Sequence, residues 1–205
     1  LIEGHPGTIR ANQLQYIPQL NDNSKFCDPK IFRDMVAEMQ ASIKQRGWYD
    51  SSNQKKEGPR AIWISRRDAP NRYLKNEAAL IEEARRILGS VEVMFLSRVP
   101  FKEQVRMLMN SEFVIGAQGQ GIASSVFSLG RKVVILEQGT MPSEQGGWAA
   151  TFRDMAELAG NQAVRFYSGL PYVIRDADWE FPKEKFVAEL TRLKQLCEIN
   201  SCLNN

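Results

Sequence analysis

Short apolar runs alternate with longer amphipathic segments along most of this chain, starting at residue 61. The apolar runs predict buried strands, and the segments between them repeat apolar side chains every three or four residues, as helices do. Strands that alternate with helices of about ten residues form a parallel sheet with helices on both faces. We therefore expect an α/β protein with a Rossmann-like parallel sheet. The predicted strands are 61–65, 91–96, 113–116, 133–136 and 165–167, and the predicted helices are 77–88, 101–109, the segment after Gly121, 151–158 and 182–196.

The first 58 residues predict an irregular entry segment and then one helix. The helix should begin at Asp28-Pro29, because aspartate is a favoured N-cap and proline is favoured in the first turn, and it should end near Gly47. We expect residues 1–58 to be a linker and N-terminal helix, and residues 59–205 to form the Rossmann-like domain. The predicted apolar stripe of the helix is Ile31, Met35, Val36, Met39 and Ile43.

The composition is that of an ordinary globular protein and excludes several kinds of site. The length of 205 residues suits one domain or two small ones, and 43% of the residues are hydrophobic and 25% charged, as in ordinary globular proteins. The net charge of +3 is too small to indicate nucleic-acid binding, and no nucleic-acid-binding signature is present. The one histidine, His5, lies in the predicted linker. A Ser-His-Asp triad and a histidine-based metal site are therefore excluded from the predicted domain.

The apolar run that begins at Phe113 ends in a glycine-rich turn with Gly116, Gly119 and Gly121. Glycines let a backbone approach a ligand closely, and the helix that follows would offer free N–H groups, a combination suited to phosphate. The spacing matches neither the dinucleotide fingerprint nor a Walker loop. A tight strand-to-helix turn whose glycines serve only packing is the alternative.

Charged residues follow other predicted strands, where ligands of doubly wound sheets bind. Arg66 and Arg72 follow the strand at 61–65, and Glu137 ends the strand at 133–136. Arginine matches phosphate oxygens, and a carboxylate could accept two ribose hydroxyls. Together with the glycine turn they predict a nucleoside diphosphate site, although each residue alone could be a solvated surface group.

The order of these motifs resembles the family 61 glycosyltransferases, also described as the DUF563 domain, over about residues 60–140. The matching motifs are Ile64-Ser65-Arg66, Arg72 to Glu77, Phe101 to Gln104, Gly116 to Phe127 and Val134 to Glu137. The resemblance implies transfer of a hexosyl or pentosyl group from a UDP-sugar to a glycan, protein hydroxyl or polysaccharide. It also implies inversion, no required metal and no separate cofactor.

The resemblance further implies a GT-B-like enzyme of two Rossmann-type lobes. This chain looks like the C-terminal, nucleotide-sugar-binding lobe, so an acceptor-binding N-terminal lobe would lie outside it. For a eukaryotic member it would imply the lumen of the secretory pathway.

On this reading, Arg66 and Arg72 neutralise the diphosphate and Glu137 holds the ribose. The amides of the glycine turn complete the cradle and stabilise the departing UDP. The expected turn residues are Gln118, Gly119, Gln120, Gly121 and Ser124.

Three residues are expected to support the site without touching the nucleotide. Asn76 and Glu77 would cap their helix and fix the loop from Ser65 to Arg72, called the arginine loop below. Gln104 would order neighbouring loops. An inverting transfer needs a general base, and the candidates are Asp68 and Glu103, or a residue of the absent lobe.

Two positions depart from the family pattern. The histidine of the glycine motif is Gln118 here, and its asparagine is Ser124. Glutamine can donate a hydrogen bond to phosphate but cannot carry charge or shuttle a proton. An active transferase and a degenerate module that only binds are both open, as is a nucleotide-dependent enzyme of unrelated chemistry.

Overall fold

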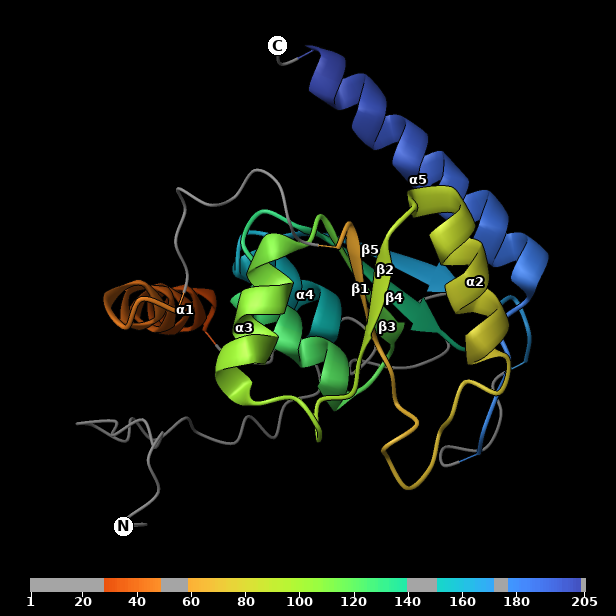
Figure 1. The fold of residues 1–205 in the computed structure, drawn as a ribbon, viewed down its shortest axis with the longest axis horizontal. Coiled ribbons are helices and arrows are strands. Elements are labelled where there is room, and N and C mark those ends of the chain that lie inside the picture. Colours follow the sequence, from red (N-terminus) through yellow and green to blue (C-terminus); the bar gives the residue numbers. More distant parts are fainter. Residues whose placement is uncertain (1–27, 49–58, 140–150, 172–176, 204–205) are drawn as a thin grey trace.

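A five-stranded, all-parallel sheet with the strand order β2-β1-β3-β4-β5 forms the centre of the structure (Figure 1). The computed structural model describes residues 28–48, 59–139, 151–171 and 177–203. The predicted α/β, Rossmann-like fold is confirmed. The strands are β1 (Ala61–Ile64), β2 (Val91–Met94), β3 (Phe113–Ala117), β4 (Lys132–Glu137) and β5 (Gln162–Tyr167), and the helices are α1 (Pro29–Gln45), α2 (Glu77–Leu88), α3 (Phe101–Asn110), η2 (Gln120–Phe127), α4 (Thr151–Leu158) and α5 (Lys183–Leu203).

The chain adds β2 on one side of β1 and adds β3 and the later strands on the other side. This change of direction positions the candidate site between β1 and β3. β1 pairs with β2 on one side and with β3 on the other, so the chain moves outwards to β2 and then crosses back over β1. Ile64 at the end of β1 lies opposite Gly116 near the end of β3. In doubly wound sheets ligands bind at such a switch point, outside the carboxyl ends of the strands.

Helices cover both faces of the sheet (Figure 1). On one face, α2 and α5 pack against Trp63, Ile115 and their neighbours. On the other, α3, η2 and α4 pack against Ile64 and Val114. Burial on both faces explains why the central strands are continuously apolar. None of the described helices is long and apolar enough to cross a lipid bilayer.

α1 begins as predicted, and its predicted apolar stripe is buried at Val36 and Ile43, with Met39 partly buried. Asp28 is the N-cap, and its carboxylate accepts a hydrogen bond from the backbone N–H of Lys30 at 2.7 Å. Ile31 and Met35 are 49% and 39% exposed, whereas Phe32 is 2% exposed. The helix docks on η2 and α4 through the face that carries Phe32. Periodicity alone could not decide which flank of the stripe is buried, because both flanks carry large apolar side chains.

The segment after Gly121 is a 3₁₀ helix, η2, and not the expected α-helix. Its first turn is closed by a hydrogen bond from the N–H of Ile122 to the carbonyl of Gly119 at 3.1 Å, and its last by one from Ser128 to Ser125 at 3.0 Å. This three-residue spacing gives a narrower helix with fewer residues per unit of length. β5 and α5 are both longer than predicted.

Candidate active site

Arg66 and Gly119 meet where β1 and β3 end. Gly119 has φ 151° and ψ 179°, a conformation that side chains rarely adopt. A Cβ atom on Gly119 would lie 2.0 Å from Nη1 of Arg66. The guanidinium of Arg66 therefore fills the space that the glycine leaves, and the arginine loop and glycine turn form one surface.

Arg66 and Arg72 are half-buried cations close enough to repel each other. Burial lowers the pKa of the Arg66 guanidinium, the charge of Arg72 lowers that pKa further, and Asp68 acts in the opposite direction. The Nε atoms of both arginines are buried without a hydrogen-bond partner among the described residues. Buried donors are normally paired, so this pair is suited to an anion with several oxygens, such as a diphosphate.

Glu77, the first residue of α2, fixes the start of the arginine loop through its carboxylate. Its carboxylate is 4% exposed and accepts hydrogen bonds from Nε1 of Trp63 at 3.0 Å and from the hydroxyl of Ser65 at 2.8 Å. It also pairs with Nε of Arg67 at 3.2 Å. Arg67 is thus committed to a structural ion pair, which leaves Arg66 and Arg72 as the available cations of this loop.

The sequence led us to expect that the side chain of Asn76 caps α2. It does not. Asn76 stands at the N-cap position but makes no side-chain capping hydrogen bond. Instead, its Nδ2 donates to the carbonyl of Phe181 at 2.6 Å and its Oδ1 accepts the N–H of Phe181 at 3.2 Å. Asn76 therefore fastens the arginine loop to the segment before α5.

Asp68 ties the loop after β1 to the loop after β2, and Gln104 of α3 holds the second of these loops. Oδ2 of Asp68 accepts hydrogen bonds from the hydroxyl of Ser97 at 2.6 Å and its N–H at 3.1 Å. Nε2 of Gln104 donates to the carbonyls of Leu96 at 2.8 Å and Val99 at 2.7 Å. These contacts give both residues a clear structural part in ordering the site.

The glycine turn is built by backbone contacts. The N–H of Gln118 donates to the carbonyl of Leu136 at 2.8 Å, which extends the sheet by one residue beyond β3. The hydroxyl of Ser124 donates to the carbonyl of Gly121 at 2.8 Å, so its proton is engaged inside η2. The side chain of Gln118 is half-buried; that of Gln120 lies outside the described part of the structure.

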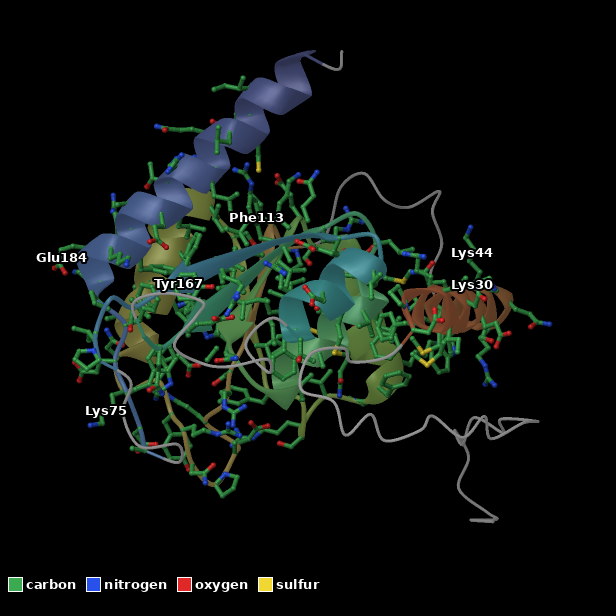
Figure 2. All side chains as sticks on the ribbon, turned by 180° about the vertical axis from the view of Figure 1, so that it is seen from behind. Lys30, Lys44, Lys75, Phe113, Tyr167 and Glu184 are labelled. Atoms are coloured by element: carbon green, nitrogen blue, oxygen red, sulfur yellow. The ribbon has the colours of Figure 1, made fainter. Side chains whose placement is uncertain are left out.

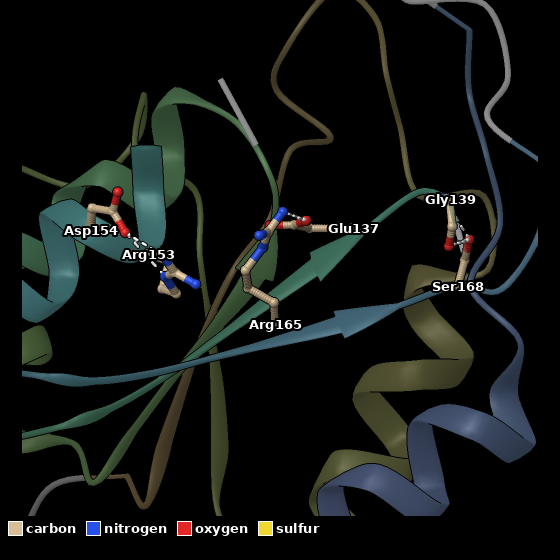
Figure 3. Close-up of polar contacts among 6 residues, drawn as sticks. All are labelled: Glu137, Gly139, Arg153, Asp154, Arg165 and Ser168. Atoms are coloured by element: carbon tan, nitrogen blue, oxygen red, sulfur yellow. Dashed lines mark hydrogen bonds and ion pairs between the residues drawn. The ribbon is translucent and has the colours of Figure 1, made fainter. Parts of the chain in front are cut away.

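Glu137 does not present its carboxylate for a ribose, which corrects the expectation from the sequence. It is fully buried and forms a two-pronged ion pair with Arg165 of β5 (Figure 3). The guanidinium of Arg165 also lies over the ring of Tyr167, 5.0 Å from its centroid. Burial raises the pKa of Glu137, and the Arg165 guanidinium opposes that rise. Both carboxylate oxygens are engaged within the protein.

The loop after β1 and the glycine turn lie within a match to a known protein family. The model described as Glycosyltransferase 61 matches residues 5–139, about two thirds of the chain, including the arginine loop and the glycine turn. The chain belongs to glycosyltransferase family 61. A search of curated proteins found no match.

In this family 61 domain, the two candidate bases differ in their surroundings. The hydrogen bonds from Ser97 lower the pKa of Asp68, which makes its carboxylate a weaker base for an acceptor hydroxyl. Glu103, in the first turn of α3, pairs with Nη2 of Arg106 at 2.6 Å. Neither geometry identifies the base.

The reasoning from sequence overlooked one motif of the family 61 chain. Asp176-Ala177-Asp178 is an Asp-x-Asp triplet, a spacing that can hold a metal-bound nucleotide. Asp176 lies outside the described residues. Oδ1 of Asp178 accepts the N–H of Tyr73 at 2.8 Å, next to Arg72. Among the described residues, no group of three or more metal-ligating side chains comes together.

Proposed function

We propose that this domain binds the diphosphate of a UDP-sugar at the switch point and transfers the sugar, with inversion and without a required metal, to a glycan or protein hydroxyl. The observation that carries the proposal is the pair Arg66 and Arg72. Both are half-buried at the carboxyl end of β1, and both have an unpartnered Nε among the described residues. The acceptor would be presented by a second lobe outside this chain.

The two arginines and the turn would act mainly on the leaving group. Negative charge grows on the UDP phosphate as the bond to the sugar breaks, and preorganised donors stabilise it most where water is excluded. Arg66 rests against Gly119, so cation and turn amides would face the same oxygens. Gln118 would add a neutral donor. The general base stays open between Glu103, the weaker base Asp68 and a residue of the second lobe.

A non-catalytic binding module is the second candidate, and Gln118 favours it. A glutamine where the family pattern has histidine removes a side chain that can carry a proton. The diphosphate cradle does not depend on that proton. Binding of UDP with no transfer from any UDP-sugar would therefore identify the module.

Calorimetric titration with UDP tests the site. Alanine at Arg66 or Arg72 removes a charged donor to phosphate, and we expect each change to weaken UDP binding by about 2 kcal/mol, roughly thirtyfold. Arg86→Ala is the matched control, because Arg86 pairs with Glu83 in the last turn of α2, on an exposed surface. It should leave the affinity unchanged.

The same titration separates the rival functions. ADP, GDP and NAD test the choice of nucleotide, and the titrations are run first with EDTA and then with manganese. Unchanged UDP affinity in both arginine variants would exclude the proposed site. Preference for ADP or NAD would indicate unrelated nucleotide chemistry, and binding only with manganese would exclude metal independence.

A further inference from the structure

We infer that Asp178 is a positioning residue that holds Arg72 in the donor site. The inference rests on the proposed function, because it assigns the structural support of one of the two arginines. Its evidence differs from the evidence for the proposed function. It comes from the backbone of residues 72–75 and from the segment 177–182, and this segment lies beyond the end of the family match at residue 139.

Arg72 has a backbone that needs support. Its φ is 61°, and no other described residue except glycine has a positive φ. A non-glycine side chain in this left-handed region carries conformational strain, which persists only where the surroundings impose it. The neighbouring charge of Arg66 adds repulsion. Without a restraint, the chain would relax Arg72 away from Arg66.

The restraint comes from a strand-like contact with the segment before α5. Oδ1 of Asp178 accepts the N–H of Tyr73 at 2.8 Å, immediately after Arg72. Two backbone hydrogen bonds follow, from Trp179 to Tyr73 at 2.9 Å and from Lys75 to Trp179 at 2.8 Å. They form an isolated parallel bridge between Leu74 and Trp179. Figure 1 shows this blue segment beside the yellow loop, and Figure 2 labels Lys75, whose N–H completes the contact.

The segment can act as a restraint because it is itself anchored in the core. Trp179 is 7% exposed and Phe181 is fully buried. Phe181 packs edge-to-face on Phe186 of α5, with ring centroids 6.3 Å apart, and Phe186 packs in the same way on Trp63 of β1, at 5.9 Å. Asp178 is thus fixed to the strand from which the arginine loop emerges.

Rigid support of this kind has a direct consequence for binding. A site whose donors are already in place does not lose affinity to the ordering of a loop. Asp178 would act through the position of Arg72, without touching the nucleotide. Its loss should therefore matter only while Arg72 is present.

A double-mutant cycle measures this dependence by UDP titration in EDTA. Asp178→Ala removes the acceptor of the Tyr73 N–H, and we expect about tenfold weaker UDP binding. Asp178→Asn keeps an oxygen acceptor and should restore most of the affinity. In the Arg72→Ala background, Asp178→Ala should have no further effect. Asp34→Ala, which breaks an exposed ion pair with Lys30 on α1, is the charge-matched control.

Several outcomes would overturn the inference. Wild-type affinity in Asp178→Ala, or the same tenfold loss in the Arg72→Ala background, would show that Asp178 does not act through Arg72. A loss seen only with manganese, and not rescued by asparagine, would make Asp178 a metal ligand. If Asp178→Ala does not fold, Asp178→Glu replaces it, because it keeps the charge and displaces the acceptor. Absence of UDP binding in the wild type would refute the proposed function instead.

Discussion

Glu137 and Arg165 show how burial decides the role of a residue. The side chain of Glu137 is completely buried and that of Arg165 is 6% exposed, and the carboxylate and guanidinium bind through both prongs. Removing one partner of such a pair leaves an uncompensated buried charge, whereas replacing both by apolar groups is often neutral or stabilising. The pair therefore has a structural role at the end of β4.

If the pair has this structural role, its loss should lower the stability of the fold and leave the affinity for UDP unchanged. Glu137→Gln should lower the free energy of unfolding by about 3 kcal/mol, measured by urea denaturation. UDP affinity of the folded variant should stay within about twofold of wild type, because Arg165 already engages both carboxylate oxygens.

The double variant Glu137→Leu/Arg165→Met is the control, and it should recover most of the lost stability. A large loss of UDP affinity in folded Glu137→Gln, with little loss of stability, would restore the ribose role that the sequence suggested.

The sequence could not reveal this pairing, because the partner belongs to a strand predicted only as 165–167. Arg165 aligns with Ile135 in the β4–β5 register, and alternate residues of a strand share a face. Arg165 is therefore on the face that carries Glu137. Asn76 was misassigned for a similar reason, since its partner Phe181 is distant in sequence.

The turn from β3 into η2 is the element in which backbone shape and charge are most closely linked. Gly119 brings the chain past the guanidinium of Arg66 and then starts a helix with three-residue hydrogen bonds. A side chain at this position would have to displace the end of Arg66. The displacement itself is easy, because arginine is flexible, but it removes the cation from its place.

Substitution of Gly119 should therefore weaken binding as well as stability. Gly119→Ala should cost about 1–3 kcal/mol in the free energy of unfolding, from backbone strain, and weaken UDP binding at least tenfold. Gly130→Ala is the matched control, since Gly130 also has a positive φ of 63° but open space around its Cα.

The control should lose a similar amount of stability and keep its UDP affinity. Equal UDP affinities in Gly119→Ala, Gly130→Ala and wild type would show that contact between Gly119 and Arg66 has no part in the site.

The positions of most helices and strands were predicted well from the sequence. Its apolar runs located all five strands of the described sheet, and α2 and α4 have the expected bounds. The helix type of η2 and the burial of Phe32 in place of Ile31 and Met35 on α1 were not predicted, because both depend on how a segment packs against the rest of the fold. The left-handed backbone of Arg72 was not predictable from the sequence, since the residue at this position is neither glycine nor asparagine.

For the whole molecule, the site joins parts of the chain that are distant in sequence. The arginine loop is held by Glu77 of α2, by the loop after β2 through Asp68, and by the segment before α5 through Asn76. A ligand that bridges the loop and the glycine turn should stabilise all of these contacts together. Binding to the folded state alone raises the free energy of unfolding with ligand concentration.

Thermal unfolding of the domain should therefore report the same site. UDP at about one hundred times its dissociation constant should add about 2.7 kcal/mol, which raises the melting temperature by roughly 5–10 °C for a domain of this size. The shift should shrink as salt screens the two arginines. Arg72→Ala should lose most of it when measured at the same UDP concentration, whereas Arg86→Ala should keep it. A shift of equal size in Arg72→Ala would mean that UDP stabilises the fold from a different surface, and the switch point would no longer be the donor site.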